Sequence, residues 1–477
     1  MKKLFSLLLC ALMLSLCACQ KTPDEEYVVN KGDNKAEEII NQTALPIPNT
    51  EPPNSDEPES TQAEVTPGWQ NATGQAVFPE HWDFNIMTEY KEMIISADIV
   101  TSGMNAYPVN LVRKTEYTAE EFLKVAAYLF QGKELTGWRS GTKPSKEYLT
   151  EAMQYIVNAD MTEEDKAINL EMLNSSLNGS NISDADNTPC ASVADIPVSS
   201  IGGTFSVFTS NGGGNISLSE GNISADTNLY CVVQPKSWFR DSDPDAPKFS
   251  AELGSEQAKA KADEFLAYMA IDGFELYSSE EARCVNIYTT EVYDTGWQLR
   301  YTRSFGYVPF SVSLNDASVD GPFSFDGKWG RSVTEYFEPI REEGITLYVT
   351  ENGIEAVNMH DPYEYVATVN ENVQLFDFEE LTDRIQLIFG AAINNPYSAE
   401  GYYKLEEMIL TVVPTAKKDS SDFYMMPVWV CKIGEYISLG DGLGLSHFYI
   451  PGEQLFEQWL TIAFNAIDGT RVSLPRG

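Results

Sequence analysis

Residues Gly344 to Met359 read GITLYVTENGIEAVNM, and their pattern decides the fold of the C-terminal half. Apolar and polar side chains alternate on both sides of Asn352-Gly353, a dipeptide that favours the tight turn of a β-hairpin. A longer alternating stretch, CVNIYTTEVYDTGWQLRYTRSFGYVPFSVSL, begins at Cys284. Because a sheet with one apolar face must bury that face, we expect a helix to pack against these strands.

Two amphipathic helices with that role are predicted. Ser255 opens the first, and its apolar face consists of Ala258, Ala262, Phe265, Leu266 and Met269. Asp377 opens the second, which has Glu380 at the capping-box position and ends at Gly390. Alternating strands follow the second helix, and the last of them turns at Asp468-Gly469.

The spacing of these elements predicts a tandem repeat. The helix starts at 255 and 377 lie 122 residues apart, and the turn glycines at 353 and 469 lie 116 apart. We therefore predict an α+β fold whose tandem modules, residues 251–375 and 376–477, each pack an amphipathic helix on an antiparallel sheet. The alternative is a coincidental likeness between two ordinary α+β modules.

A mixed α+β domain is expected at 68–250. Apolar and polar residues alternate over 98–117, as in two short strands. Thr118 to Glu121 form a capping box for a helix that stops at Gly132. The inner face of this helix is expected to consist of Phe122, Val125, Ala126 and Leu129. Helices are also predicted at about 145–158 and 162–177, with inward faces of Tyr148, Ala152, Tyr155 and Ile156 and of Ile168, Met172 and Leu173. An Asn/Gly/Ser-rich insertion, about 174–228, repeats the phrase GNIS at 214 and 221, which predicts turns there.

Residues 1–18 have the pattern of a bacterial export signal. Lys2 and Lys3 precede an apolar run that is too short to cross a bilayer comfortably. The run ends in Leu16-Cys17-Ala18-Cys19, which resembles the lipobox of bacterial lipoproteins. The resemblance implies that Cys19 carries a diacylglycerol, whose two acyl chains anchor the chain to the outer face of the cytoplasmic membrane. The alternative is an ordinary signal peptide that leaves Cys19 as a thiol.

Residues 19–67 are expected to form a disordered acidic tether behind that lipidated cysteine. The segment from Gln20 to Pro67 contains eleven acidic residues and three lysines, and it has repeated prolines and almost no apolar periodicity. A flexible coil of this length places the folded body on the order of 40 Å from the anchor.

The charge of the body limits its partners. Residues 68–477 contain 60 acidic and 27 basic residues, which gives a formal net charge of −33. Nucleic acid and anionic lipid headgroups should repel such a body, so we expect no nucleic-acid partner and favour neutral or cationic ones. An acidic surface that only solvates an exported protein is the alternative.

The final strands carry a further resemblance. Pro427, Trp429 and the phrase AFNAIDGTRVS at 463–473 resemble the PepSY-like modules of bacterial exported proteins. The arrangement is similar to extracytoplasmic accessory regulators of cell-wall sensor kinases, which pair such modules in tandem, and the whole chain is similar to uncharacterised lipoproteins of Gram-positive anaerobes. These families imply binding or inhibition at the cell surface rather than catalysis.

Four cysteines remain in the body, Cys190, Cys231, Cys284 and Cys431, and three pairings are open. Cys190 and Cys231 flank the insertion, so a disulfide between them could staple it. Cys284 and Cys431 lie in strand patterns and are expected to be buried small apolar residues.

One segment has the spacing of a cation site. Asp241, Asp243, Asp245 and Glu252 stand at positions 1, 3, 5 and 12 of a calcium loop. Ala246 occupies the position where the loop requires glycine, so an acidic interdomain linker is the competing interpretation and no cofactor is otherwise expected.

No catalytic constellation emerges from the sequence. His81, His360 and His447 have no histidine partner at helical spacing, and Ser446 lacks the second glycine of a G-x-S-x-G elbow. Ser140 and Lys143 match S-x-x-K only by letter, because Gly141 and Pro144 oppose a helix. We therefore expect a non-enzymatic, lipid-anchored cell-surface protein that binds a protein or cell-wall partner or regulates a membrane or wall component. A carbohydrate- or peptide-capturing lipoprotein is the alternative, and a wall-active hydrolase is a third possibility.

Overall fold

The structure is a computed structural model of the chain. It describes residues 35–47, 77–89, 92–140, 146–158, 162–178, 192–196, 203–209, 212–219, 221–228, 231–239, 247–287, 291–310, 318–319, 343–393, 401–417, 420–438 and 455–472. All structural statements below concern these residues.

Six α-helices lie in the described residues: α2 (Lys35–Ile40), α3 (Ala119–Leu129), α4 (Lys146–Asn158), α5 (Glu163–Asn178), α6 (Ser255–Met269) and α7 (Phe378–Ile393). None of these helices is long and apolar enough to span a membrane.

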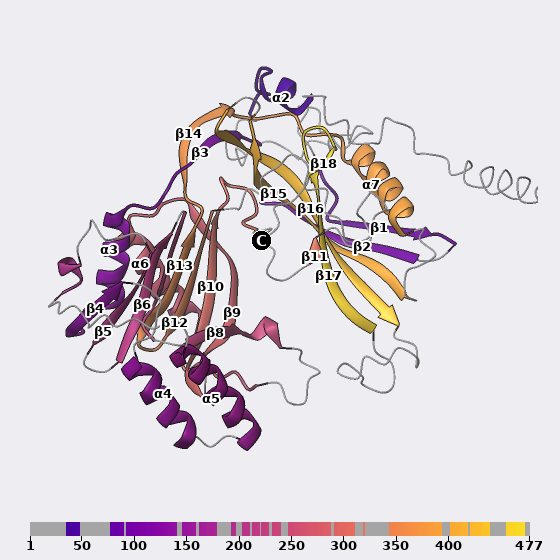
Figure 1. The fold of residues 1–477 in the computed structure, drawn as a ribbon. Helices are drawn as coiled ribbons and strands as arrows, with labels where there is room; N and C mark the ends of the chain where they lie inside the picture. Colours follow the sequence, from indigo (N-terminus) through magenta and orange to yellow (C-terminus); the bar gives the residue numbers. More distant parts are fainter. Residues whose placement is uncertain are drawn as a thin grey trace, which may run out of the picture.

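The described strands form two sheets, and Figure 1 shows them side by side in two lobes. The first, here called the central sheet, has the order β4-β5-β6-β7-β13-β12-β10-β9-β8. Its strands are β4 (Leu135–Ser140), β5 (Gly203–Thr209), β6 (Gly212–Ser219), β7 (Asn222–Asp226), β8 (Cys231–Pro235), β9 (Phe274–Asn286), β10 (Val292–Arg303), β12 (Gly344–Thr350) and β13 (Gly353–His360).

The second, here called the terminal sheet, has the order β1-β2-β15-β16-β17-β11, with β3 paired to β14 and β16, and β18 paired to β17. Its strands are β1 (His81–Met87), β2 (Glu92–Val100), β3 (Val109–Lys114), β11 (Ser318–Val319), β14 (Tyr363–Asn370), β15 (Gly401–Ala416), β16 (Asp422–Ser438), β17 (Leu455–Asn465) and β18 (Arg471–Val472). The predicted α+β class is therefore confirmed.

The two sheets do not follow the expected divisions at 250 and 375. The terminal sheet takes β1 to β3 from the N-terminal region and most of its other strands from beyond residue 363, whereas the central sheet is built almost entirely from the chain between them. Strand pairing between distant segments, such as β2 with β15, cannot be read from local periodicity. The tandem repetition of two modules stays a prediction.

A helix does pack on each sheet. α6 contacts β10, β12 and β13 of the central sheet, and α7 contacts β1 and β2 of the terminal sheet. The predicted buried face of α6, from Ala258 to Met269, is buried throughout. α3 lies beside α6 on the central sheet, with all four predicted core residues buried and the Thr118–Glu121 capping box formed.

The hairpin that decides the C-terminal pattern forms as predicted. β12 and β13 pair antiparallel from Gly344↔His360 to Thr350↔Gly353, and Gly353 adopts a positive φ of 126° at the turn. Asp468-Gly469 likewise turns β17 back into β18. At the start of α7, Asp377 Oδ1 accepts hydrogen bonds from the backbone N–H groups of Glu379 and Glu380, as an N-cap should. This helix runs three residues past Gly390, to Ile393.

Two expectations in the N-terminal region were wrong. In α5 the predicted inward residues Ile168 and Met172 are 54% and 51% exposed, because α5 packs against α4 through Leu173 and its neighbours. Gly214, which opens the first of the two GNIS phrases, lies inside β6 rather than in a turn. A Cβ there would come within 2.1 Å of Asp226 O and 2.7 Å of the Phe130 ring, so this glycine permits close packing.

Part of the expected disordered tether is ordered. Residues 35–40 form α2, and Ile40 is fully buried in the core of the terminal sheet. Asn370 Nδ2 donates to Ile40 O at 3.0 Å and to Gln42 O at 3.2 Å, and Leu45 N donates to Asn372 O at 2.9 Å. The apolar Ile39-Ile40 pair supplies the buried surface that an acidic, proline-rich segment otherwise lacks.

Replacement of Ile40 by alanine tests this docking. We expect Ile40→Ala to lower the free energy of unfolding by about 2 kcal/mol or more, because it leaves a cavity in the core of the terminal sheet. Glu38→Ala, on an exposed position of the same helix, is the matched control and should change stability little. Urea unfolding followed by tryptophan fluorescence measures both, and equal midpoints for the two variants would contradict the docking.

Candidate functional site

β1 forms an exposed edge of the terminal sheet. It pairs antiparallel with β2 over its whole length, from His81↔Asp98 to Met87↔Glu92, and within the described residues it has no other strand partner. Its side chains are mostly exposed, including Phe84 at 44% and Met87 at 70%. Figure 1 shows β1 and β2 at the rim of this lobe, beside α7.

The direction of the outer backbone groups follows from the register. Ile99 N donates to Glu80 O at 3.0 Å, so the pair 80/99 is a hydrogen-bonded pair. Hydrogen-bonded pairs alternate along an antiparallel ladder, so 82, 84 and 86 bond to β2. The N–H and C=O groups of His81, Asp83, Asn85 and Met87 therefore point away from β2.

The side chains of these β1 residues lie on one face of the sheet and form a polar network with side chains of β2. His81 Nδ1 lies 2.7 Å from Asp98 Oδ1, while His81 Nε2 lies 3.1 Å from Asp83 Oδ1 and 3.2 Å from Ser96 Oγ. Further along the strand, Asn85 Nδ2 donates to Glu92 Oε1 at 2.9 Å. The register explains this network, because His81 stands opposite Asp98 and Asp83 opposite Ser96.

The protonation state of His81 determines which hydrogen bonds the network can make. A carboxylate only accepts hydrogen bonds, so both ring nitrogens can bond Asp98 and Asp83 together only when the imidazole is doubly protonated. The hydrogen bond to Asp98, followed by that to Asp83, raises the pKa of His81. In the neutral ring, the Ser96 hydroxyl can instead donate to Nε2. Deprotonation of His81 therefore changes the charge on this edge, and its raised pKa moves that change above the ordinary histidine range.

Asp98, His81 and Ser96 stand in the order of a serine-hydrolase triad, with the carboxylate on Nδ1 and the hydroxyl near Nε2. Two features separate the network from such a site. Asp83 shares Nε2 with the serine, and the Asp83 and Asp98 side chains are 74% and 73% exposed, whereas acyl transfer uses a water-excluded oxyanion site. The geometry fits a solvated recognition surface better than a nucleophile.

A second titratable cluster lies on the central sheet. Asp226 ends β7, next to Glu355 on β13, and the Thr227 hydroxyl donates to Glu355 Oε2. Burial raises the pKa of Asp226 to about 7, and the nearby Glu355 carboxylate adds to the shift. The backbone N–H of Asn228 donates to Asp226 Oδ1 at 2.7 Å and opposes it. The cluster satisfies its own hydrogen bonds, so we regard it as part of the fold.

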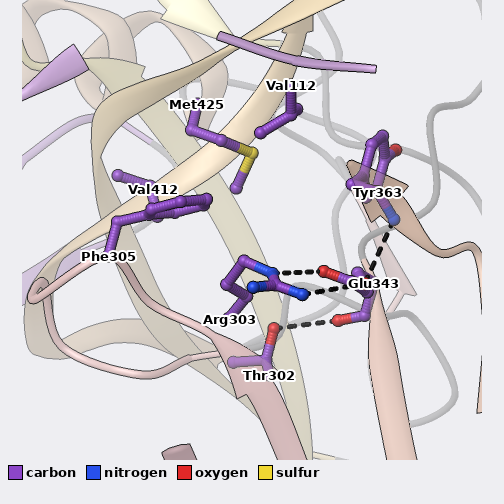
Figure 2. A pocket seen from close by; sticks show the side chains of 8 residues that line it. All are labelled: Val112, Thr302, Arg303, Phe305, Glu343, Tyr363, Val412 and Met425. Carbon is purple, nitrogen blue, oxygen red and sulfur yellow. Dashed lines mark hydrogen bonds and ion pairs between the residues drawn. The ribbon is translucent and has the colours of Figure 1, made fainter. Parts of the chain in front are cut away.

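The small cavity in Figure 2 lies between the two sheets. Arg303 Nε donates to Glu343 Oε2 at 2.7 Å, and Tyr363 N donates to Glu343 Oε1 at 3.1 Å. Apolar side chains from both lobes complete the lining: Val112, Phe305, Val412 and Met425. The cavity volume is about 10 Å³, room for about one water molecule rather than a ligand.

Most residues predicted from the sequence to form sites lie outside the described residues. These are Cys19, Cys190, Asp241, Asp243 and Asp245; His447 and Ser446, for which no site was expected, also lie outside the described residues. Glu252, the last predicted calcium ligand, is exposed just before α6, and the described residues contain no cluster of metal-ligating side chains. Cys231 is described, on β8. Cys284 and Cys431 are 1% and 0% exposed, which confirms the prediction that both are buried.

Sequence reasoning missed β1 and its network. The alternation of Trp82, Phe84 and Ile86 with polar residues in HWDFNIM would have indicated a strand. The contact between His81 and Asp98, 17 residues apart, depends on the hairpin register. No spacing rule for helical histidines could find it.

The His81 network yields a titration test. Asp98→Asn should lower the His81 pKa, because it removes the carboxylate that contributes most to the raised value. Glu92→Gln, at the other end of the ribbon, should leave it unchanged. NMR titration of the His81 ring signals measures both. The raised pKa also implies that protonated His81 stabilises the fold at low pH, and that this contribution disappears as pH rises through the folded-state value. An unchanged His81 pKa in Asp98→Asn would contradict the geometry.

Asp226 yields a second test. Its folded-state pKa of about 7 exceeds the usual aspartate value, so ionisation destabilises the fold as pH rises from about 4 to 7. Asp226→Asn keeps an oxygen acceptor for Asn228 N and removes that penalty. We expect the variant to be more stable than wild type by about 1 to 3 kcal/mol at pH 8, with little gain at pH 4. Thermal melts across this range measure the effect, with Glu351→Gln on the exposed β12–β13 turn as control. A gain that does not change with pH would contradict the assignment.

No family model matches the chain, and no curated protein matches it. Among solved structures, it is similar to an uncharacterized protein from Eubacterium rectale ATCC 33656, whose crystal structure was determined at 1.45 Å resolution. The two chains share 12% sequence identity with a TM-score of 0.47, over 83% of this chain and 94% of the other. A likeness at this level carries no conclusion about fold or function.

Proposed function

We propose that the chain is a non-enzymatic lipoprotein, held by a diacylglycerol on Cys19 at the outer face of the bacterial cytoplasmic membrane, that binds a protein partner and thereby regulates a membrane or cell-wall component. The lipobox resemblance at Leu16 to Cys19 supports the anchor. The PepSY-like resemblance of the C-terminal strands supports binding or inhibition rather than catalysis.

The outward backbone of β1 carries the binding part of the proposal. Four residues, His81, Asp83, Asn85 and Met87, direct N–H and C=O groups away from β2. An extended segment of a partner can add to this edge as a further strand. Main-chain hydrogen bonds then supply affinity, and the side chains beside them supply selectivity.

Charge indicates the chemistry of the partner segment. Glu80, Asp83, Glu89 and Asp98 are exposed around the edge, and His81 is the basic residue among them. The body as a whole is strongly acidic. A lysine- or arginine-rich extended segment therefore complements the edge, and electrostatic attraction speeds its association.

Capture of a carbohydrate or free peptide is the alternative function. Capture sites usually enclose several hundred Å³. The cavity between the sheets is about 10 Å³, so an exposed edge supports the partner-binding proposal better than this cavity supports capture.

Proline at position 85 tests the edge. Asn85→Pro removes an outward N–H without removing a β1–β2 ladder bond, whereas Asn85→Ala keeps the N–H and loses the same side chain. We expect Asn85→Pro to weaken binding of a fluorescent peptide of alternating lysine and valine by roughly tenfold or more, and Asn85→Ala to bind like wild type. Fluorescence anisotropy at low and physiological salt measures both.

Two outcomes would contradict the proposal. If Asn85→Pro and Asn85→Ala bind the peptide with equal affinity, the β1 edge is not the binding site. Covalent labelling by a fluorophosphonate that disappears in Ser96→Ala would show a nucleophile in the His81 network and support a hydrolase instead.

A further inference from the structure

Cys231 and Cys284 lie together on the side of the central sheet that faces away from α6. β8 pairs antiparallel with β9 in the register Cys231↔Asn286 and Val233↔Cys284, so the two cysteines occupy diagonal positions on one face. They share an apolar cluster with Ala282 and Tyr348. Cys284 is 1% exposed at the centre of this cluster, and Cys231 is only partly buried at its edge.

The two thiols are in direct contact. The hydrogen bond between them raises the pKa of Cys284, and burial raises it further. The carboxylates of Asp226 and Glu355 also disfavour a negative charge on that sulfur. Cys284 is therefore a poor first nucleophile, while Cys231 is the thiol that an external reagent can reach.

We propose that Cys231 and Cys284 are joined by a disulfide that fastens the edge strand β8 to β9. Within the described residues β8 pairs with β9 alone, so it has freedom to make the small approach that converts a thiol contact into a covalent bond. The bond would close the chain between residues 231 and 284, which includes α6, and so constrain the unfolded state.

The oxidant is a disulfide of the thiol–disulfide exchange type, as supplied by an extracytoplasmic oxidoreductase. The Cys231 thiolate attacks the oxidant, forms a mixed disulfide and releases one thiol. Cys284, losing its proton to solvent, then attacks the Cys231 sulfur and releases the second thiol. Two protein thiols are oxidised and one external disulfide is reduced. The use of this oxidant in cells rests on the proposed extracytoplasmic location, because the cytosol keeps thiols reduced.

The pairing competes with the bridge between Cys190 and Cys231 that the sequence leaves open, since Cys231 can bond only one partner. Trypsin alone leaves Cys190 and Cys231 in one peptide, because no lysine or arginine lies between Lys166 and Lys236, so it cannot tell which of the two is linked to Cys284. Additional cleavage after glutamate separates Cys190 from Cys231 at Glu220 and releases Cys284 in the peptide 284–291.

The test uses the full-length chain, isolated from membranes of a bacterial host with free thiols alkylated at lysis, and digested with both proteases without reduction. We expect a linked species of peptides 221–236 and 284–291 that disappears on reduction. In a second arm, unalkylated protein is reduced and then treated with oxidised glutathione. Failure to form this species in the second arm, or a link from Cys231 to Cys190 in either arm, overturns the pairing.

The two arms separate this inference from the proposed location. A link that forms with glutathione but is missing from cells supports the pairing and contradicts the extracytoplasmic location. Cys231→Ala and Cys284→Ala should each lower the melting temperature of the oxidised protein by roughly 5 °C or more, and the double variant should add little. Cys431→Ala, which changes the other buried thiol, should leave the linked species intact, and its loss in that variant would contradict the assignment.

Discussion

The carboxylate of Glu343 joins the two lobes, and much of the arrangement depends on it. Glu343 precedes β12 of the central sheet and is only 8% exposed, yet its oxygens accept from Arg303 on β10 and from the backbone of Tyr363, where the terminal sheet resumes. Close by, Lys114 Nζ at the end of β3 lies 2.8 Å from Asp361 Oδ1. Charge-assisted bonds thus lie beside several of the points where the chain passes between the sheets. The carboxylates of Glu343 and Asp361 are nearly buried there, whereas the Lys114 side chain is half-exposed. A charge buried this deeply is costly to leave unpaired, which favours one relative placement of the sheets.

The terminal sheet also carries an exposed strand edge, β1. Exposed edges invite pairing with any chain, and proteins commonly defend them with charge. The described charged side chains on β1 and β2 and next to them in the sequence are negative apart from His81, so they disfavour pairing with other acidic chains, including copies of this one, and leave the edge open to a basic segment. Protection against self-association and selection of a partner are then two results of one charge pattern.

Local pattern predicted the helices that pack on the sheets and the hairpins, because capping residues, apolar periodicity and Asn-Gly or Asp-Gly turns act over a few residues. It failed where distant segments meet. The pairing of β2 with β15, the contact of His81 with Asp98 and the proximity of Cys231 to Cys284 each depend on register or sheet order. The docking of Ile40 was not predicted for another reason: two adjacent apolar residues in an acidic segment are too short a pattern to indicate where the segment packs. Gly214 was misassigned because glycine serves close packing as readily as turns.

The burial of Ile40 changes the geometry of anchoring. If lipid holds Cys19, only fifteen residues, 20–34, lie between that anchor and the start of α2, and this stretch spans at most roughly 55 Å in any conformation. A tether that extended to Pro67 would reach roughly 165 Å. The volume that the terminal sheet can sample is then smaller by a factor on the order of 30, and its local concentration near a membrane-bound partner rises correspondingly. The β1 edge belongs to the same sheet, so a modest intrinsic affinity would suffice for a partner embedded in that membrane.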